Sequence, residues 1–264
     1  MSAKYPSHPI TASGESTLVP KGPWNYGLTV IGVHVRCDPE KLREAVPKPL
    51  EASSDGEVWF YIADIVSVSD SKPELNYEAP DLVQYYEATM FVKVVYEGKT
   101  YALCPFMYVD KDLPLMRGIV AGFPKKLAYI SMTKLHPLLP AYSKPSENLV
   151  LGGFAVRSSY PLFKLKVKLE SRVDKLPFDE FGEWLLPRYF PSIGELGGVA
   201  ELVAFEPEYK RYGEIWRGSG EVEVYGGVND EMKIFEPKEV LGGYYYTVAI
   251  KPRRLRLVAK MELE

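Results

Sequence analysis

The sequence has few of the residues that build cross-links and metal centres. Its 264 residues include two cysteines, Cys37 and Cys104, and three histidines, which lie far apart at positions 8, 34 and 136. Two cysteines cannot form the disulfide framework of a small secreted domain. Neither a C-x-x-C nor an H-E-x-x-H motif occurs, so the sequence predicts no zinc site.

Long apolar runs and excess positive charge are missing as well. No stretch approaches the roughly 20 apolar residues that a membrane-spanning helix needs, and residues 1–17 lack the apolar segment of a signal peptide. The 32 basic and 35 acidic side chains give a net charge of −3, without the basic excess of nucleic-acid-binding domains. We therefore expect no membrane and no nucleic acid as partners, and a cytoplasmic protein.

Motifs of two large enzyme classes are also missing. The residues GKT at 98–100 resemble the end of a phosphate-binding P-loop, but Lys93 stands where that motif requires glycine. No G-x-G-x-x-G and no G-x-S-x-G sequence occurs, so neither a dinucleotide enzyme nor a serine hydrolase has support.

Strand-forming residues are abundant in this chain. The predicted strands are 28–36, 57–69, 85–96, 101–110, 127–133, 148–158, 162–170, 199–206, 209–216, 220–225, 244–250 and 254–262. Helices are predicted only at 38–46, 113–120 and 178–186. Many strands separated by turn residues favour a closed or nearly closed antiparallel sheet. The predicted fold class is mainly β (α+β), a single-domain antiparallel β-barrel or cone with a few short helices.

The domain organisation follows from the same pattern. Residues 1–18 are polar and without periodicity, which predicts a flexible N-terminal arm. Residues 19–264 are predicted to form one β-barrel domain. The only alternative boundary falls in 134–147, which we interpret as a long loop.

The segment GFPKKL, at 122–127, holds the only adjacent pair of lysines in the chain. Such a pair is usually solvated, but Lys125 and Lys126 follow an apolar run. Pro124 predicts a turn into a strand, where successive side chains point to opposite faces. One lysine would then enter the interior, where burial and the neighbouring ammonium both lower the pKa of its amine. A neutral amine of this kind can form a Schiff base with a ketone.

Several segments together carry a family resemblance. GFPKKLAY (122–129) resembles the lysine motif of the acetoacetate decarboxylase family. VPKGPW (19–24), LREAVPKPLE (42–51) and YYEA (85–88) are similar to family segments in the same order. Three later segments, LPRYFPSI (186–193), EIWRGSGEVEV (214–224) and PKEVLGG (237–243), extend the resemblance almost to the C-terminus.

The resemblance implies roles for individual residues. Lys125 would be the Schiff-base nucleophile, Lys126 its companion, and Glu87 a group for proton transfer or substrate positioning. From composition alone, Glu87 is an exposed strand residue. The residues expected to bind substrate are Tyr61, Phe123, Met107, Arg117 and Tyr245. The family chemistry implies no metal or organic cofactor, a small keto acid as substrate, and a homo-oligomer.

The sequence also departs from the decarboxylase pattern. Decarboxylases of this type carry an arginine in the first strand, where this chain reads GLTVI (27–31), and a second glutamate where Tyr61 stands. They carry G-R-E near the position of RGI (117–119). Arg117 or Arg36 could replace the missing arginine.

Three functions therefore stay open at this stage. The first is decarboxylation of a β-keto acid such as acetoacetate through a lysine imine and enamine, the activity of a carboxy-lyase. The second is a lysine-dependent aldolase-dehydratase on the same scaffold, for which one of Tyr244, Tyr245 and Tyr246 could serve as acid and base. The third is a non-catalytic barrel that binds a small ligand.

Overall fold

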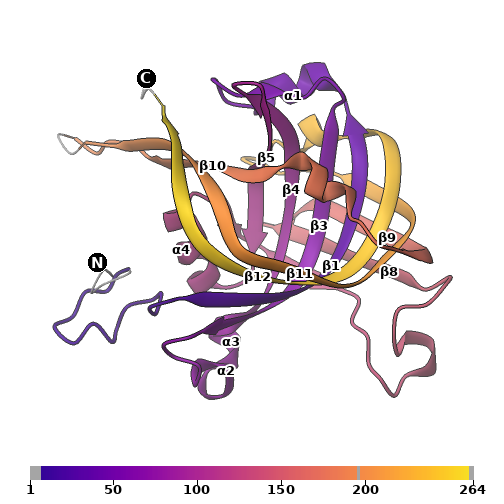
Figure 1. Cartoon of the computed structure of the whole chain (residues 1–264), viewed down its shortest axis with the longest axis horizontal. Helices are drawn as coiled ribbons and strands as arrows, with labels where there is room; N and C mark the ends of the chain where they lie inside the picture. Colours follow the sequence, from indigo (N-terminus) through magenta and orange to yellow (C-terminus); the bar gives the residue numbers. More distant parts are fainter. Residues whose placement is uncertain (1–6, 195–196, 262–264) are drawn as a thin grey trace.

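The computed structural model describes residues 7–194 and 197–261, and most of them belong to one large β-sheet (Figure 1). The strands are β1 (Trp24–Cys37), β2 (Glu51–Ala52), β3 (Glu57–Ser69), β4 (Gln84–Tyr96), β5 (Lys99–Val109), β6 (Lys125–Leu127), β7 (Tyr129–Met132), β8 (Val150–Arg157), β9 (Tyr160–Val173), β10 (Glu183–Phe190), β11 (Val199–Val224) and β12 (Pro237–Lys260). The α-helices are α1 (Pro39–Ala45), α2 (Leu75–Glu78), α3 (Pro80–Val83) and α4 (Asp112–Ala121), and three short 3₁₀ turns span Pro140–Tyr142, Pro177–Phe181 and Met232–Phe235. The expected mainly-β class is confirmed.

The sheet curls because one strand joins two of its parts. The strand order runs β10-β5-β4-β3-β1-β12-β11, and β10 pairs with both β5 and β11. The second half of β11 pairs with β9, from which β8 and β7 continue the sheet. Most pairs are antiparallel as predicted, but β5 pairs in parallel with β10 and with β6.

The central strands are buried on both faces, and each face contributes to a different core. Ile31, Phe60 and Met90 belong to one hydrophobic cluster, whereas Trp59 and Phe91 belong to another. Successive side chains of a strand point to opposite faces, so neighbouring residues enter separate cores. The second core contains most of the aromatic side chains that line the cavity described below.

One predicted helix is wrong. Residues 178–186 form a short 3₁₀ turn followed by β10. Gly182 separates the two with φ +87°, a conformation that a helix does not contain. Trp184 and Leu185 pair with β5 on one side and β11 on the other, so strand pairing outweighed a helix-like spacing of apolar residues.

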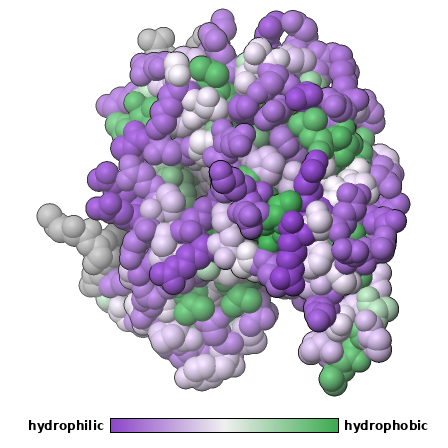
Figure 2. All heavy atoms as spheres, turned by 45° about the vertical axis from the view of Figure 1, so that its right-hand side comes forward, coloured by the Kyte–Doolittle hydropathy of each residue, from purple (hydrophilic) through white to green (hydrophobic). Residues whose placement is uncertain are grey.

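Other differences concern strand ends and the termini. The predicted strands between 199 and 225 are one long strand, β11, and those predicted at 244–250 and 254–262 belong to β12 as far as Lys260, with residue 262 outside the described residues. In the predicted N-terminal arm, residues 7–18 contain no helix or strand, whereas residues 1–6 lie outside the described residues. None of the helices within the described ranges is long and apolar enough to cross a membrane. The face in Figure 2 is largely hydrophilic, with small separate hydrophobic patches.

Candidate active site

The GFPKKL segment joins helix α4 to strand β6. Gly122 ends the helix in the left-handed region with φ +101°, which favours glycine, and its N–H bonds to helix carbonyls. After Pro124, strand β6 pairs in parallel with β5, so that Lys125 lies beside Met107 and Lys126 beside Tyr108. The turn into a strand occurs where the sequence predicted it, and the two lysines point to opposite faces.

Lys125 forms a buried ion pair with Glu87. Its Nζ lies 2.9 Å from Glu87 Oε2, and the two side chains are 6% and 7% exposed. The Tyr61 hydroxyl donates a 2.6 Å hydrogen bond to the other carboxylate oxygen, Oε1. Burial raises the pKa of Tyr61 well above its usual value, and the Glu87 charge raises it further. Tyr61 therefore remains a hydrogen-bond donor, and Glu87 is held between it and the ammonium group.

Gly118 makes room for the Lys125 side chain. A Cβ atom at this position of helix α4 would lie 2.3 Å from Lys125 Cδ, closer than any unstrained contact. The aliphatic stem of the lysine thus passes directly over the helix backbone. A glycine inside a helix normally lowers helix stability by about 1 kcal/mol relative to alanine. The close approach of the Lys125 stem explains why glycine occupies this position.

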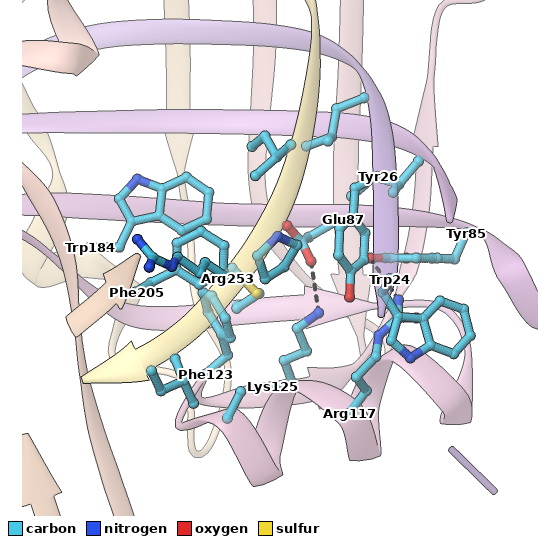
Figure 3. A pocket seen from close by; sticks show the side chains of 18 of the residues that line it. Trp24, Tyr26, Tyr85, Glu87, Arg117, Phe123, Lys125, Trp184, Phe205 and Arg253 are labelled. Atoms are coloured by element: carbon cyan, nitrogen blue, oxygen red, sulfur yellow. Dashed lines mark hydrogen bonds and ion pairs between the residues drawn. The ribbon is translucent and has the colours of Figure 1, made fainter. Parts of the chain in front are cut away.

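Lys125 and Glu87 line a cavity of about 410 Å³ (Figure 3). Of the residues predicted for the site, Lys125, Glu87, Tyr61, Phe123, Met107 and Arg117 all line it. Its remaining walls are Pro23, Trp24, Tyr26, Leu28, Ile65, Tyr85, Gly118, Ala121, Trp184, Phe205, Ile250, Pro252, Arg253, Arg254 and Leu255. Elements from both ends of the chain therefore meet around one amine.

Arg117 lies in this cavity against a group of aromatic rings. Its Cζ is 4.3 Å from the centre of the Trp24 ring and 4.8 Å from that of Tyr26, within the range of cation–π attraction. Its guanidinium lies 3.4 Å from the Ser67 and Tyr85 hydroxyls. Burial raises the pKa of Tyr26 to about 12 despite the nearby positive charge. The rings are thus neutral, and no carboxylate in the described part of the chain pairs with Arg117.

Lys126 and Tyr245 lie outside the cavity. Lys126 points to the opposite face of β6, where its Nζ lies 2.8 Å from Asp230 Oδ1. Asp230 is almost fully buried and also receives a 2.9 Å hydrogen bond from Tyr108 and a 3.2 Å contact from Arg157. Burial alone would raise the pKa of Asp230, but the hydrogen bonds and these positive charges lower it. Tyr245 packs in the other core.

Arg36, the other arginine that could replace the missing one, also lies outside the cavity. It forms an exposed pair with Glu239, with Nη1 and Oε2 2.7 Å apart. The Tyr244 ring packs against Trp59, and Tyr246 packs against Tyr212. Arg117 is therefore the arginine of those two that reaches the cavity.

Sequence reasoning missed several wall residues. Trp24 and Tyr85 lie in the quoted segments VPKGPW and YYEA but were given no role, and Tyr26, Trp184 and Arg253 lie in none of the quoted segments. Tyr85 could have been found, because it lies two residues before Glu87 on a strand and so shares its face. Trp184 was assigned to a helix. Across the described ranges, no group of three or more His, Cys, Asp or Glu side chains is arranged to hold a metal ion.

Comparisons with known proteins identify the family of this chain. Residues 7–261 match the acetoacetate decarboxylase (ADC) family. An acetoacetate decarboxylase of Burkholderia cenocepacia (strain HI2424) is 31% identical over 117 residues, which cover 43% of this chain and 42% of the relative. The chain thus matches less than half the length of such curated relatives.

Solved structures are similar over nearly the whole chain. An acetoacetate decarboxylase-like enzyme from Sphingomonas wittichii RW1 has a TM-score of 0.89 and 25% identity, covering 97% of this chain and 100% of that one. The enduracididine biosynthesis enzyme MppR, complexed with the condensation product of pyruvate and imidazole 4-carboxaldehyde, has a TM-score of 0.86 and 25% identity, covering 96% and 95%. Because the family match spans residues 7–261, nearly the whole chain, this chain belongs to the acetoacetate decarboxylase family.

Proposed function

We propose that this protein is an enzyme that forms a Schiff base between Lys125 and the ketone of a small keto acid. The observation that carries this proposal is the buried contact of 2.9 Å between Lys125 Nζ and Glu87 Oε2 at the wall of a cavity. An ammonium group must lose a proton before it can attack a carbonyl, and Glu87 is within hydrogen-bond distance to accept it. The neutral amine then adds to the ketone, and loss of water leaves a C=N bond.

Glu87 and Tyr61 would handle protons in the later steps. The protonated imine withdraws electrons from the neighbouring carbon, which allows an enamine to form by loss of a proton or of CO₂. Glu87 lies beside the Lys125 nitrogen, and the 2.6 Å hydrogen bond from Tyr61 fixes the position of the Glu87 carboxylate. A fixed carboxylate requires little reorganisation during proton transfer.

Arg117 is proposed to bind the carboxylate of the keto acid. Both the Lys125 amine and the Arg117 guanidinium lie over the Tyr85 ring, at 5.6 and 5.9 Å from its centre. Aromatic rings pack against the half-buried Arg117, and no carboxylate of the described residues pairs with its charge. Guanidinium groups bind carboxylates with two parallel hydrogen bonds.

This position of Arg117 favours a reaction in which the carboxylate is retained. A guanidinium that neutralises a carboxylate stabilises the ground state of a decarboxylation more than its transition state, in which that charge moves away. Aldol condensation and dehydration keep the carboxylate throughout. The whole-length similarity to MppR, whose structure holds a condensation product of pyruvate, supports the same choice.

Decarboxylation of a β-keto acid is the second candidate, because the curated relatives are named acetoacetate decarboxylases. The homo-oligomer and the cytoplasmic location remain predictions.

Borohydride trapping tests the proposal. The protein is incubated with pyruvate or acetoacetate, reduced, digested and examined by mass spectrometry. We expect a reduced adduct on Lys125 and none in Lys125→Ala. Absence of an adduct with every keto acid tried would leave only the ligand-binding alternative. CO₂ release from acetoacetate, or an unsaturated product from pyruvate and an aldehyde, then distinguishes the two reactions.

A further inference from the structure

A β-bulge places one residue of β12 at the cavity. In the pairing of β12 with β11, Arg254 lies opposite Glu206 and Pro252 opposite Pro207, which leaves Arg253 as an extra residue without a partner. A bulge of this kind bends the strand and redirects the side chain, and bulges often occur beside active sites. Arg253 lines the cavity from this position.

Figure 3 shows Arg253 and Arg117 on opposite sides of Lys125. Arg117 lies among Trp24 and the tyrosines, whereas Arg253 lies toward Phe205 and Trp184. The two guanidinium groups come from different elements, β12 and helix α4. The reacting amine therefore lies between two separate cationic positions.

The charges of the lining residues are unbalanced. Four cationic side chains and one carboxylate, Glu87, line the cavity within the described ranges. Lys125 pairs with Glu87, and Arg254 pairs with Glu206 at 2.6 Å, outside the lining. Arg117 and Arg253 have no carboxylate partner among the residues that the structure describes. Two cationic groups at separate positions are thus available to a ligand.

The cavity wall on the Arg253 side of Lys125 is apolar and aromatic. The rings of Phe123 and Trp184 meet edge to face at 6.1 Å between centres, and Trp184 stacks on Phe205 at 5.2 Å. Met107 adds a further apolar surface. A ligand that fits this arrangement has an anion at each end and an apolar segment between them.

From this arrangement we infer that Arg253 binds a second carboxylate of the substrate, distant from the reacting carbonyl. The inference rests on the proposed function for the position of the reacting carbonyl, and it names the substrate class as dicarboxylic. The second carboxylate belongs either to the keto acid itself or to the aldehyde that condenses with it. In both cases Arg253 determines specificity and takes no part in the bond changes at Lys125.

Binding of saturated acids tests this directly, because they have no carbonyl and cannot form an imine. Succinate, glutarate, adipate and pimelate are compared by calorimetry with the monoacids butyrate, pentanoate, hexanoate and heptanoate. We expect the best diacid to bind about fivefold more tightly than the monoacid of the same length, the upper end of the effect of one added ion pair at an exposed arginine.

Two matched variants test whether Arg253 causes the preference for diacids. Arg253→Gln is expected to reduce the diacid preference to less than about twofold. Arg43→Gln removes the same charge from an exposed pair with Glu40 on helix α1, and its preference should stay as in the unmodified protein. Equal binding of diacids and monoacids, or a preference that persists in Arg253→Gln, would overturn the inference.

Trapping experiments then locate the second carboxylate and keep the two proposals apart. A keto diacid such as 2-oxoglutarate, and pyruvate combined with glyoxylate or with acetaldehyde, are each reduced with borohydride. If 2-oxoglutarate gives a higher adduct yield than pyruvate, the second carboxylate belongs to the keto acid. If pyruvate forms product faster with glyoxylate than with acetaldehyde, the second carboxylate belongs to the aldehyde. Adducts on Lys125 without any preference for a second carboxylate would refute the role of Arg253 and leave the Schiff base intact. Tight diacid binding without any adduct would refute the Schiff base and retain the Arg253 site.

Discussion

Each face of strand β6 carries one lysine, and the two lysines have different surroundings. Lys125 meets one carboxylate, Glu87, at the wall of a cavity. Lys126 pairs with Asp230, which also contacts Arg157 and accepts a hydrogen bond from Tyr108. The Lys126 ammonium group also donates a hydrogen bond to the Asn229 carbonyl. The first amine has one anionic partner and open space beside it, whereas the second belongs to a network of several partners.

This difference separates a reactive group from a structural one. An amine that must attack a carbonyl needs access and a partner that can take its proton. Both conditions hold for Lys125, whereas Asp230 is shared by three donors and lies outside the cavity. We expect mutations on the Lys125 face to lower activity and mutations on the Lys126 face to lower stability.

The largest expected effect comes from the lysines themselves. Lys125→Ala should reduce turnover at least about 10³-fold, because it removes the nucleophile. Lys126→Ala is the matched control and should stay within about tenfold, since Lys126 does not line the cavity. Steady-state rates of both variants are compared after each is shown by circular dichroism to be folded. Equal losses would refute the division between the two faces.

Replacing the carboxylate beside Lys125 comes next. Glu87→Gln keeps an oxygen that can accept the Tyr61 hydrogen bond but removes the proton acceptor. Loss of a general base typically costs about 10²–10⁴-fold, and we expect the rate of imine formation to fall by about 10²-fold. The rate at which the borohydride-reduced adduct appears measures this. An unchanged rate would show that another group takes the proton.

On the other face, Asp230→Asn should act on stability. We expect the free energy of unfolding at pH 7 to fall by about 2 kcal/mol, because Lys126 and Arg157 lose their charged partner but remain partly open to water. Urea unfolding measures this value, and activity at low temperature should change little. A large loss of activity in a stable Asp230→Asn protein would contradict the structural role.

The same variant has a distinct pH dependence. Because the pKa of Asp230 is lowered in the fold, its stabilisation is present above the unfolded value of about 3.9 and is lost as pH falls through the folded value. The difference in stability between the protein and Asp230→Asn should therefore shrink below about pH 4, where Asp230 of the unfolded chain takes up a proton before that of the folded protein. Urea unfolding at a series of pH values tests the sign.

The smallest effect concerns the space for the lysine stem. Gly118→Ala would place a methyl group against Lys125 Cδ, and we expect kcat/KM to fall about tenfold as the amine moves from its position. Moving the lysine stem also disturbs the buried pair with Glu87, so the thermal midpoint should fall although alanine favours helix. Gly27→Ala is the control, because a Cβ there meets no atom within 4 Å. Equal activity of the two variants would show that the stem adjusts freely.

Much of the fold was predictable because alternation is a local property. Strands β3 and β4 and helices α1 and α4 lie within one or two residues of their predicted bounds. The helix predicted at 178–186 failed because the pairing of β10 with β5 and β11 involves residues far away in the chain. Local sequence contains no information about such partners.

The candidate site divides in the same way. Lys125, Glu87 and Tyr61 were found from the motif and the resemblance, and the structure brings all three together. Gly118 and Arg253 were missed, because the role of the first depends on a helix meeting a lysine stem and that of the second on a bulge between two long strands.

By itself, the sequence determined that the adjacent lysines begin a strand and therefore point to opposite faces, since that alternation follows from backbone geometry. Only the tertiary structure decided which face opens into a cavity and which carboxylate meets each amine. Glu87 and Asp230 lie 38 and 104 residues from their lysines. Contacts over such separations depend on how the whole sheet curls, which no local pattern specifies.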